Sequence, residues 1–67
     1  IIMKLDVEGM EPEAIRGGAN FINSCSNLRV IYEHFPEDDY RNDKCLLAVC
    51  NFTFNNLDEV NRVATKV

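Results

Sequence analysis

The pattern of apolar and polar residues divides the chain into blocks, and these blocks are alternately typical of strands and of helices. Short apolar runs that contain β-branched residues favour strands. Longer blocks with apolar residues three and four positions apart favour amphipathic helices. In chain order the pattern predicts a strand over residues 1–6, a helix over 12–24, a strand over 28–33, a helix over 39–50, a strand over 52–57 and a final strand over 60–67.

The first predicted helix carries signals for its start and for its shape. Pro12 fits the first helical position, where its missing N–H costs nothing. Ile15 and Ile22 recur at helical spacing, so one face of the helix is apolar. Gly17 and Gly18 weaken the helix by about 1 kcal/mol per residue relative to alanine. We therefore expect either a kink at these glycines or a close approach of the helix to the sheet.

The alternation of strands and helices predicts an α/β fold. Strand, helix, strand, helix and strand in succession favour a parallel sheet with right-handed crossovers, and we expect the final strand, over 60–67, to run antiparallel. Parallel sheets are covered by helices on both faces, whereas this chain supplies only two predicted helices. Part of the sheet is therefore expected to lie bare, and self-association through it is one predicted interaction.

Size and cysteine content narrow the class of protein. The 67 residues suffice for one small domain, and a folded chain of this length buries only about 60% of its unfolded surface. Cys25, Cys45 and Cys50 form an odd set, which favours reduced thiols and a cytoplasmic location over a secreted disulfide framework. Together with His34 they lack the Cys-x-x-Cys spacing of a zinc site. We interpret the cysteines as core residues and expect no metal.

Charge and hydropathy argue against two kinds of partner. The net charge is −4, and the seven lysines and arginines are scattered, so we expect no nucleic-acid interface. No apolar run approaches the roughly 20 residues that span a bilayer, so we expect no membrane segment. The chain begins inside a strand-like run without an initiator methionine, and we interpret it as a fragment whose N-terminal part is missing.

Acidic residues end or follow the first two predicted strands. Asp6 ends the first strand and Glu8 follows it, while Glu33 ends the second and His34 follows it. Ligands of open parallel sheets bind beyond the carboxyl ends of the strands, so we expect these side chains to converge on one edge. Lys4 shares a strand face with Asp6, and a lysine in a buried apolar strand needs such a partner. The acids could instead cap the next helix or face water, and the histidine could be a loop residue without a role.

A longer run around these acids resembles a family signature. It reads Met3-Lys4-Leu5-Asp6-Val7-Glu8-Gly9-Met10-Glu11-Pro12-Glu13-Ala14-Ile15-Arg16-Gly17-Gly18-Ala19. This run is similar to the signature of the FkbM family of S-adenosylmethionine-dependent methyltransferases, in which a strand ends in Lys-x-Asp-Val-Glu-Gly, a glutamate follows and a helix carries Leu-(Arg/Lys)-Gly-Ala. Here Ile15 stands for the leucine, and one additional glycine precedes Ala19. The next strand of the family ends in glutamate, as residues 30–33 do here.

The resemblance implies a class I methyltransferase fold, which is Rossmann-like. Residues 1–6, 28–33 and 52–57 would be its fourth, fifth and sixth strands, so residues 1–67 would be the C-terminal portion of a methyltransferase domain and only part of that domain.

The resemblance also implies roles for the residues at the edge. Asp6, Glu8 and Glu33 would be catalytic, by orienting the acceptor hydroxyl, accepting its proton or stabilising the sulfonium charge. Asp6 would also contact the cofactor. The residues expected to contact the acceptor are Lys4, Glu11 and His34.

By the same resemblance, the chain is a fragment of an O-methyltransferase that uses S-adenosylmethionine and acts on a hydroxyl acceptor such as a sugar or other small molecule. The glycine-rich loop that cradles the cofactor and the acid that binds its ribose have no counterpart in this sequence. We therefore expect the fragment to be inactive alone. Two other interpretations stay open: a small acidic α/β module that binds a partner, and a truncated remnant without function.

Overall fold

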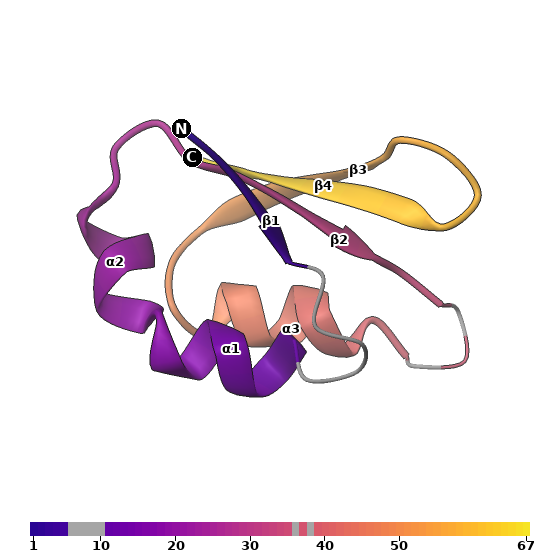
Figure 1. The fold of residues 1–67 in the computed structure, drawn as a ribbon, viewed down its shortest axis with the longest axis horizontal. Coiled ribbons are helices and arrows are strands. Elements are labelled where there is room, and N and C mark those ends of the chain that lie inside the picture. Colours follow the sequence, from indigo (N-terminus) through magenta and orange to yellow (C-terminus); the bar gives the residue numbers. More distant parts are fainter. Residues whose placement is uncertain (6–10, 36, 38) are drawn as a thin grey trace.

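The computed structural model describes residues 1–5, 11–35, 37 and 39–67. Its elements follow the predicted order, and each predicted strand ends within one residue of the observed one (Figure 1). In chain order the elements are β1 (Ile2–Leu5), α1 (Glu11–Gly17), α2 (Ala19–Ser24), β2 (Arg29–Glu33), α3 (Arg41–Leu47), β3 (Phe52–Asn56) and β4 (Asn61–Lys66).

The predicted helix over residues 12–24 is divided into α1 and α2 at Gly18. This residue has φ −98° and ψ 12°, and it provides no side chain to cap α2. A Cβ atom built on Gly18 would lie 3.3 Å from the carbonyl oxygen of Ala14, whereas one on Gly17 would meet no described atom within 4 Å. The predicted kink is confirmed, and the close neighbour belongs to the preceding helix rather than to the sheet. Neither these helices nor α3 is long and apolar enough to cross a membrane.

The four strands form one mixed sheet in the order β1-β2-β4-β3. β1 and β2 are parallel, while β4 is antiparallel to both β2 and β3. The predicted common direction of the first three strands is confirmed, although β4 lies between β2 and β3 and makes the sheet mixed. The expected antiparallel direction of the last strand is confirmed. β3 and β4 are joined by a short turn over residues 57–60, so β4 pairs back along β3 and separates it from β2.

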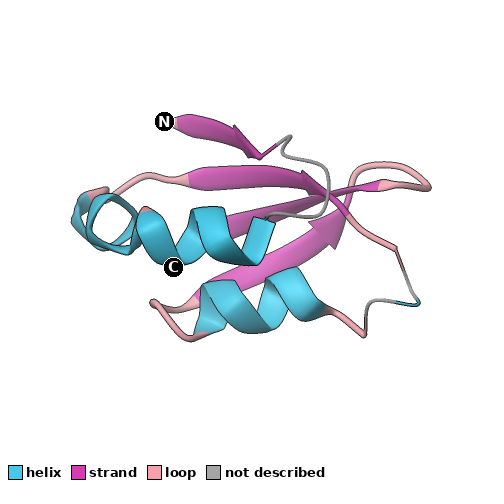
Figure 2. Cartoon of the chain, turned by 60° about the horizontal axis from the view of Figure 1, so that its bottom comes forward, coloured by secondary structure: helices cyan, strands magenta, loops and turns pink. Residues whose placement is uncertain are grey.

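The helices lie on one face of the sheet, as Figures 1 and 2 show from two directions. Side chains that alternate along the central strands meet these helices in one core. The buried apolar side chains are Leu5, Ile15, Ile22, Cys25, Leu28, Val30, Tyr32, Leu46, Phe52 and Ala64. Within the described part of the chain no helix covers the opposite face, in agreement with the predicted bare surface.

Lys4 lies on this opposite face of the sheet. It pairs in register with Ile31 of β2, and its side chain is exposed. The expectation that this lysine is buried in an apolar strand is therefore wrong, because Lys4 lies on the face of the sheet that no described helix covers. Lys4 thus needs no buried ionic partner.

The C-terminus of α2 is capped by a lysine from the far end of the chain. The Nζ atom of Lys66 donates hydrogen bonds to the carbonyl oxygens of Ile22, Asn23 and Cys25, at 2.9, 2.8 and 2.5 Å. The last carbonyl groups of a helix lack intrahelical partners and carry partial negative charge, so a cation stabilises them. Lys66 therefore fixes α2 to the end of β4.

Candidate functional site

The carboxyl ends of β1 and β2 meet at one edge of the sheet. The two strands are in parallel register, with Leu5 opposite Tyr32. β4 begins at the same edge, where Asn61 lies opposite Glu33. The prediction that the first two strands end side by side is confirmed for the backbone up to Leu5. Ligands of open α/β sheets bind at such an edge.

The structure describes four of the six predicted site residues. Glu33 is exposed at the end of β2, on the same face as Lys4. Glu11 begins α1 and is only 6% exposed, with a polar or ionic partner of its own. Asp6 and Glu8 lie outside the described residues, so their convergence on this edge stays a prediction.

His34, the fourth described site residue, connects the two loops at the edge. Its backbone N–H donates to the carbonyl oxygen of Val60 at 2.7 Å. Its ring lies 4.7 Å from the ring of Tyr40, centroid to centroid, at an interplanar angle of 35°. The backbone of His34 thus joins the loop after β2 to the turn between β3 and β4, while its half-buried ring packs against Tyr40. Because His34 follows Glu33, the edge carries an exposed carboxylate and an imidazole on adjacent residues.

A buried polar cluster that sequence reasoning missed lies beneath this edge. The Tyr32 hydroxyl donates to Oδ1 of Asp43. The Nε atom of Arg62 donates to both carboxylate oxygens of Asp43, at 3.1 and 2.9 Å, and its Nη2 atom lies 2.8 Å from Oδ2. The Asp43 and Arg62 side chains are 8% and 14% exposed. Three elements, β2, α3 and β4, are therefore joined by one carboxylate.

The guanidinium group of Arg62 has further neighbours. Its Nη1 atom donates to Oδ1 of Asn56 at 2.9 Å. Its Cζ atom lies 5.5 Å from the ring centroid of Tyr40 and 5.3 Å from that of Phe54. A cation at this distance is attracted by the ring quadrupole. Because Tyr40 also contacts His34, the cluster extends from the core to the edge.

The environment of the cluster fixes its protonation. Burial raises the pKa of the Tyr32 phenol well above its ordinary value, and the hydrogen bond and charge of Asp43 raise it further. Burial alone would lower the pKa of the Arg62 guanidinium, but the hydrogen bond and charge of Asp43 outweigh burial and raise it. Tyr32 therefore stays neutral and Arg62 stays charged at neutral pH. With three donors on Asp43, the cluster is suited to hold structure rather than to exchange protons with a substrate.

Two signals in the sequence point to this cluster. Asp43 precedes Leu46 by three positions, so both lie on the same side of α3, and Leu46 is fully buried. Arg62 and Ala64 are two positions apart in β4 and share its covered face, where Ala64 is also fully buried. A buried aspartate and an arginine on a covered strand face each need a partner of opposite charge.

The cysteines belong to the core or pack against it. All three thiols are free, with Cys25 buried and Cys45 and Cys50 half-buried against the core. Within residues 1–5, 11–35, 37 and 39–67, no three histidine, cysteine or acidic side chains are grouped so that they could hold a metal ion.

Neither a protein-family model, nor a curated protein, nor a solved structure matches this chain. A function therefore has to be argued from the residues at the carboxyl edge and from the resemblance carried by residues 3–19.

Proposed function

We propose that the chain is the C-terminal portion of a class I methyltransferase domain that transfers a methyl group from S-adenosylmethionine to a hydroxyl oxygen, such as that of a sugar, in the cytoplasm. The observation that carries the proposal is the parallel pairing of β1 and β2. It brings the end of the signature-bearing strand next to Glu33, which the resemblance makes a site residue. The antiparallel final strand also agrees with the C-terminal part of such a sheet.

The described residues fit part of what this reaction needs. Glu33 is an exposed carboxylate at the edge where ligands of α/β sheets bind. A carboxylate there can orient an acceptor hydroxyl, accept its proton or stabilise a nearby positive charge. S-adenosylmethionine would supply the electrophilic methyl group, and a glycine-rich loop to cradle it is not part of this sequence. We therefore propose that this chain contributes the acceptor side of the site.

Asp6 is the residue whose replacement tests the proposal most directly. In the gene product that contains residues 1–67, Asp6→Asn keeps the side-chain shape and removes the charge. Loss of a general base typically lowers turnover by about 10²–10⁴-fold, and we expect such a fall with the melting temperature unchanged. Glu33→Gln should also lower turnover, whereas Glu59→Gln, at an exposed acid in the β3–β4 turn, is the matched control.

The measurement is transfer of a labelled methyl group to a panel of sugars and other hydroxyl compounds. Near-normal turnover in a folded Asp6→Asn variant would reject the catalytic role of this residue. Absence of transfer to every acceptor by the unmodified gene product would reject the methyltransferase proposal itself.

The uncovered face of the sheet favours a second candidate, a module that self-associates. Ile31 and Val63 lie opposite each other on this face and remain half-buried without a covering helix. We expect sedimentation velocity to find a dimer that Ile31→Lys dissociates. Leu47→Lys, which changes an exposed apolar residue of α3, should leave the dimer intact. A monomer at all concentrations would exclude self-association. A folded monomer that also lacks methyltransferase activity would favour the interpretation of the chain as a truncated remnant without function.

A further inference from the structure

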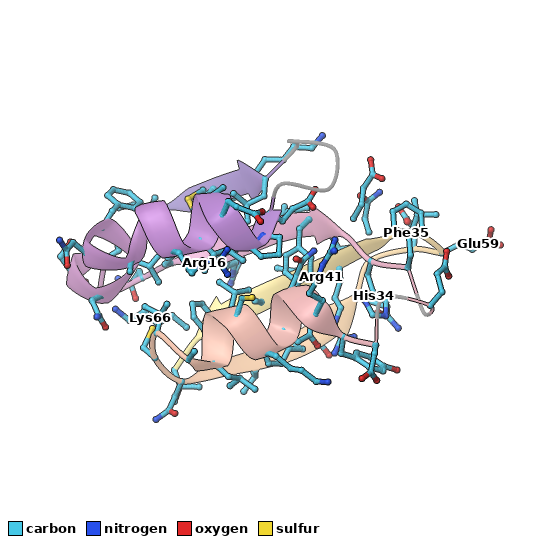
Figure 3. All side chains as sticks on the ribbon, turned by 90° about the horizontal axis from the view of Figure 1, so that it is seen from below. Arg16, His34, Phe35, Arg41, Glu59 and Lys66 are labelled. Carbon is cyan, nitrogen blue, oxygen red and sulfur yellow. The ribbon has the colours of Figure 1, made fainter. Side chains whose placement is uncertain are left out.

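A groove runs between the α1–α2 pair and α3, in the helical layer of the molecule. Its volume is about 380 Å³, which falls within the range of about 300–1,000 Å³ typical of small-molecule sites. Figure 3 shows Arg16 between α1 and α3, with its side chain directed toward α3. The residues that line the groove are Arg16, Ala19, Lys44, Cys45, Ala48 and Val49.

The lining combines an apolar floor with two cations. Ala19, Cys45 and Val49 are half-buried and form the floor, while Arg16 and Lys44 are exposed. No described carboxylate lines the groove. The groove is therefore apolar within, and one cationic side chain from α1 and one from α3 lie at its mouth.

Both cations are available to an incoming anion. The Nη2 atom of Arg16 lies 3.5 Å from Oε1 of Glu13, and the Nζ atom of Lys44 lies 2.9 Å from Oδ2 of Asp39. All four side chains are largely exposed, and exposed ion pairs contribute little to stability. A ligand carboxylate can therefore replace either acid at small cost, whereas the apolar floor can be covered only by an apolar group.

We propose that the groove binds a single-chain amphiphilic anion, a carboxylate with an unbranched alkyl tail. The head group lies between Arg16 and Lys44, and the tail covers Ala19, Cys45 and Val49. The two cations select against an uncharged lipid of the same length, since only an ionised head group forms ion pairs with both of them. The proposal does not depend on the methyltransferase proposal, because none of the residues at the carboxyl edge of the sheet lines the groove.

The cysteines provide a built-in reporter for this binding. Cys45 lines the groove, whereas Cys50, equally half-buried, does not. The chain is alkylated with N-ethylmaleimide in the presence of dodecanoate below its micellar concentration, and modification of each cysteine is followed by mass spectrometry. At a ligand concentration ten times Kd, only the free fraction reacts, so alkylation of Cys45 should slow about tenfold. Alkylation of Cys50 should be nearly unchanged.

Charge variants test the role of the head group. Arg16→Gln combined with Lys44→Gln should raise the dodecanoate concentration needed for protection by about tenfold or more, since hydrogen bonds to charged groups are lost. Arg29→Gln, which removes an exposed cation on the opposite face of the sheet, should leave the protection of Cys45 unchanged. Circular dichroism confirms that the variants are folded, and Arg16→Gln alone provides a milder change if the double variant is not.

Three results would overturn the proposal. The first is equal protection of Cys45 by dodecanol, which would mean that the charged head group is irrelevant. The second is equal protection of Cys50, which would indicate unspecific coating of the chain. The third is stronger protection of Cys45 by an acidic amphipathic peptide, with alternating glutamate and leucine, than by dodecanoate, which would make the groove a protein-docking site.

Discussion

Asp43→Asn is expected to destabilise the fold far more than any change to an exposed acid. The substitution keeps the size of the side chain but removes the negative charge that holds the Arg62 guanidinium and accepts the Tyr32 hydroxyl. Removing one partner of a buried ion pair leaves an uncompensated charge, and typically costs about 3–5 kcal/mol. The 14% exposure of the Arg62 side chain lets water reach part of the guanidinium, so we expect a cost of about 3 kcal/mol.

This cost is large relative to the stability of so small a domain. At typical values per residue, a chain of this length has a free energy of unfolding of about 3–10 kcal/mol. In a domain of this size, a loss of about 3 kcal/mol lowers Tm by about 12–24 °C. Thermal and urea unfolding, followed by circular dichroism in dilute solution, measure both quantities. They should be recorded at one fixed chain concentration, because self-association would change the apparent stability.

Asp39→Asn is the matched control. Asp39 lies just before α3, is likewise paired with a basic side chain, Lys44, and is largely exposed. It adopts a left-handed backbone conformation with φ 54°, which asparagine tolerates as well as aspartate does. We therefore expect little change in Tm. Equal effects of Asp39→Asn and Asp43→Asn would refute the reasoning that burial makes the Asp43 pair important.

The combination of Asp43→Leu with Arg62→Met tests the same reasoning from the other side. Replacing a buried ion pair by apolar residues of similar volume is often neutral or stabilising. The double variant should therefore be more stable than either single variant. A double variant as unstable as the sum of the two single changes would show that the two charges are not energetically coupled.

Three further predictions concern the cap of α2, alkaline pH and the cofactor. Lys66→Met should cost about 1–3 kcal/mol in urea unfolding, because three helix-end carbonyl groups lose a charged donor, while Lys4→Met should cost almost nothing. The pKa of Tyr32 is raised above its ordinary 10.0. The contribution of Tyr32 to stability is therefore fully present below pH 10 and is lost at higher pH as the phenol of the unfolded state ionises. A Tyr32→Phe variant that loses stability above pH 10 as much as the unmodified chain does would contradict this. Isothermal titration of the 67-residue chain with S-adenosylmethionine should show no binding, and micromolar binding would mean that these residues form a cofactor pocket by themselves.

Local sequence patterns were sufficient to predict the elements but not their pairing. The break at Gly18 follows from two adjacent glycines, and the strands follow from short apolar runs, because each depends on neighbours in the sequence. The position of β4 between β2 and β3 depends on pairing between distant residues. Alternation along one strand does not identify its neighbours, so this insertion could not be read from the pattern.

The candidate site was predictable to the same limited extent. Parallel strands place Glu33 and the end of β1 at one edge, as the order of elements implied. The burial of Glu11 and the contact of His34 with Tyr40 depend on tertiary packing, which the periodicity of a helix or strand does not specify. The partners of Asp43 come from β2 and β4, 11 and 19 residues away, and spacing within α3 shows only that this carboxylate is turned inward.

Two adjacent residues at the end of β2 differ in role. Tyr32 belongs to the buried cluster, whereas Glu33 belongs to the proposed site at the carboxyl edge. Tyr32 points to the covered face and joins Asp43, whereas Glu33, the next residue, lies on the uncovered face and is exposed. Because successive side chains of a strand point to opposite faces, the buried cluster fixes the backbone that carries Glu33 without using its carboxylate. Glu33→Gln should therefore leave Tm unchanged in a protein where Asp43→Asn lowers it strongly. If Glu33→Gln lowered Tm as much, Glu33 would belong to the structural network, and its role in the proposed methyl transfer would lose its physical basis.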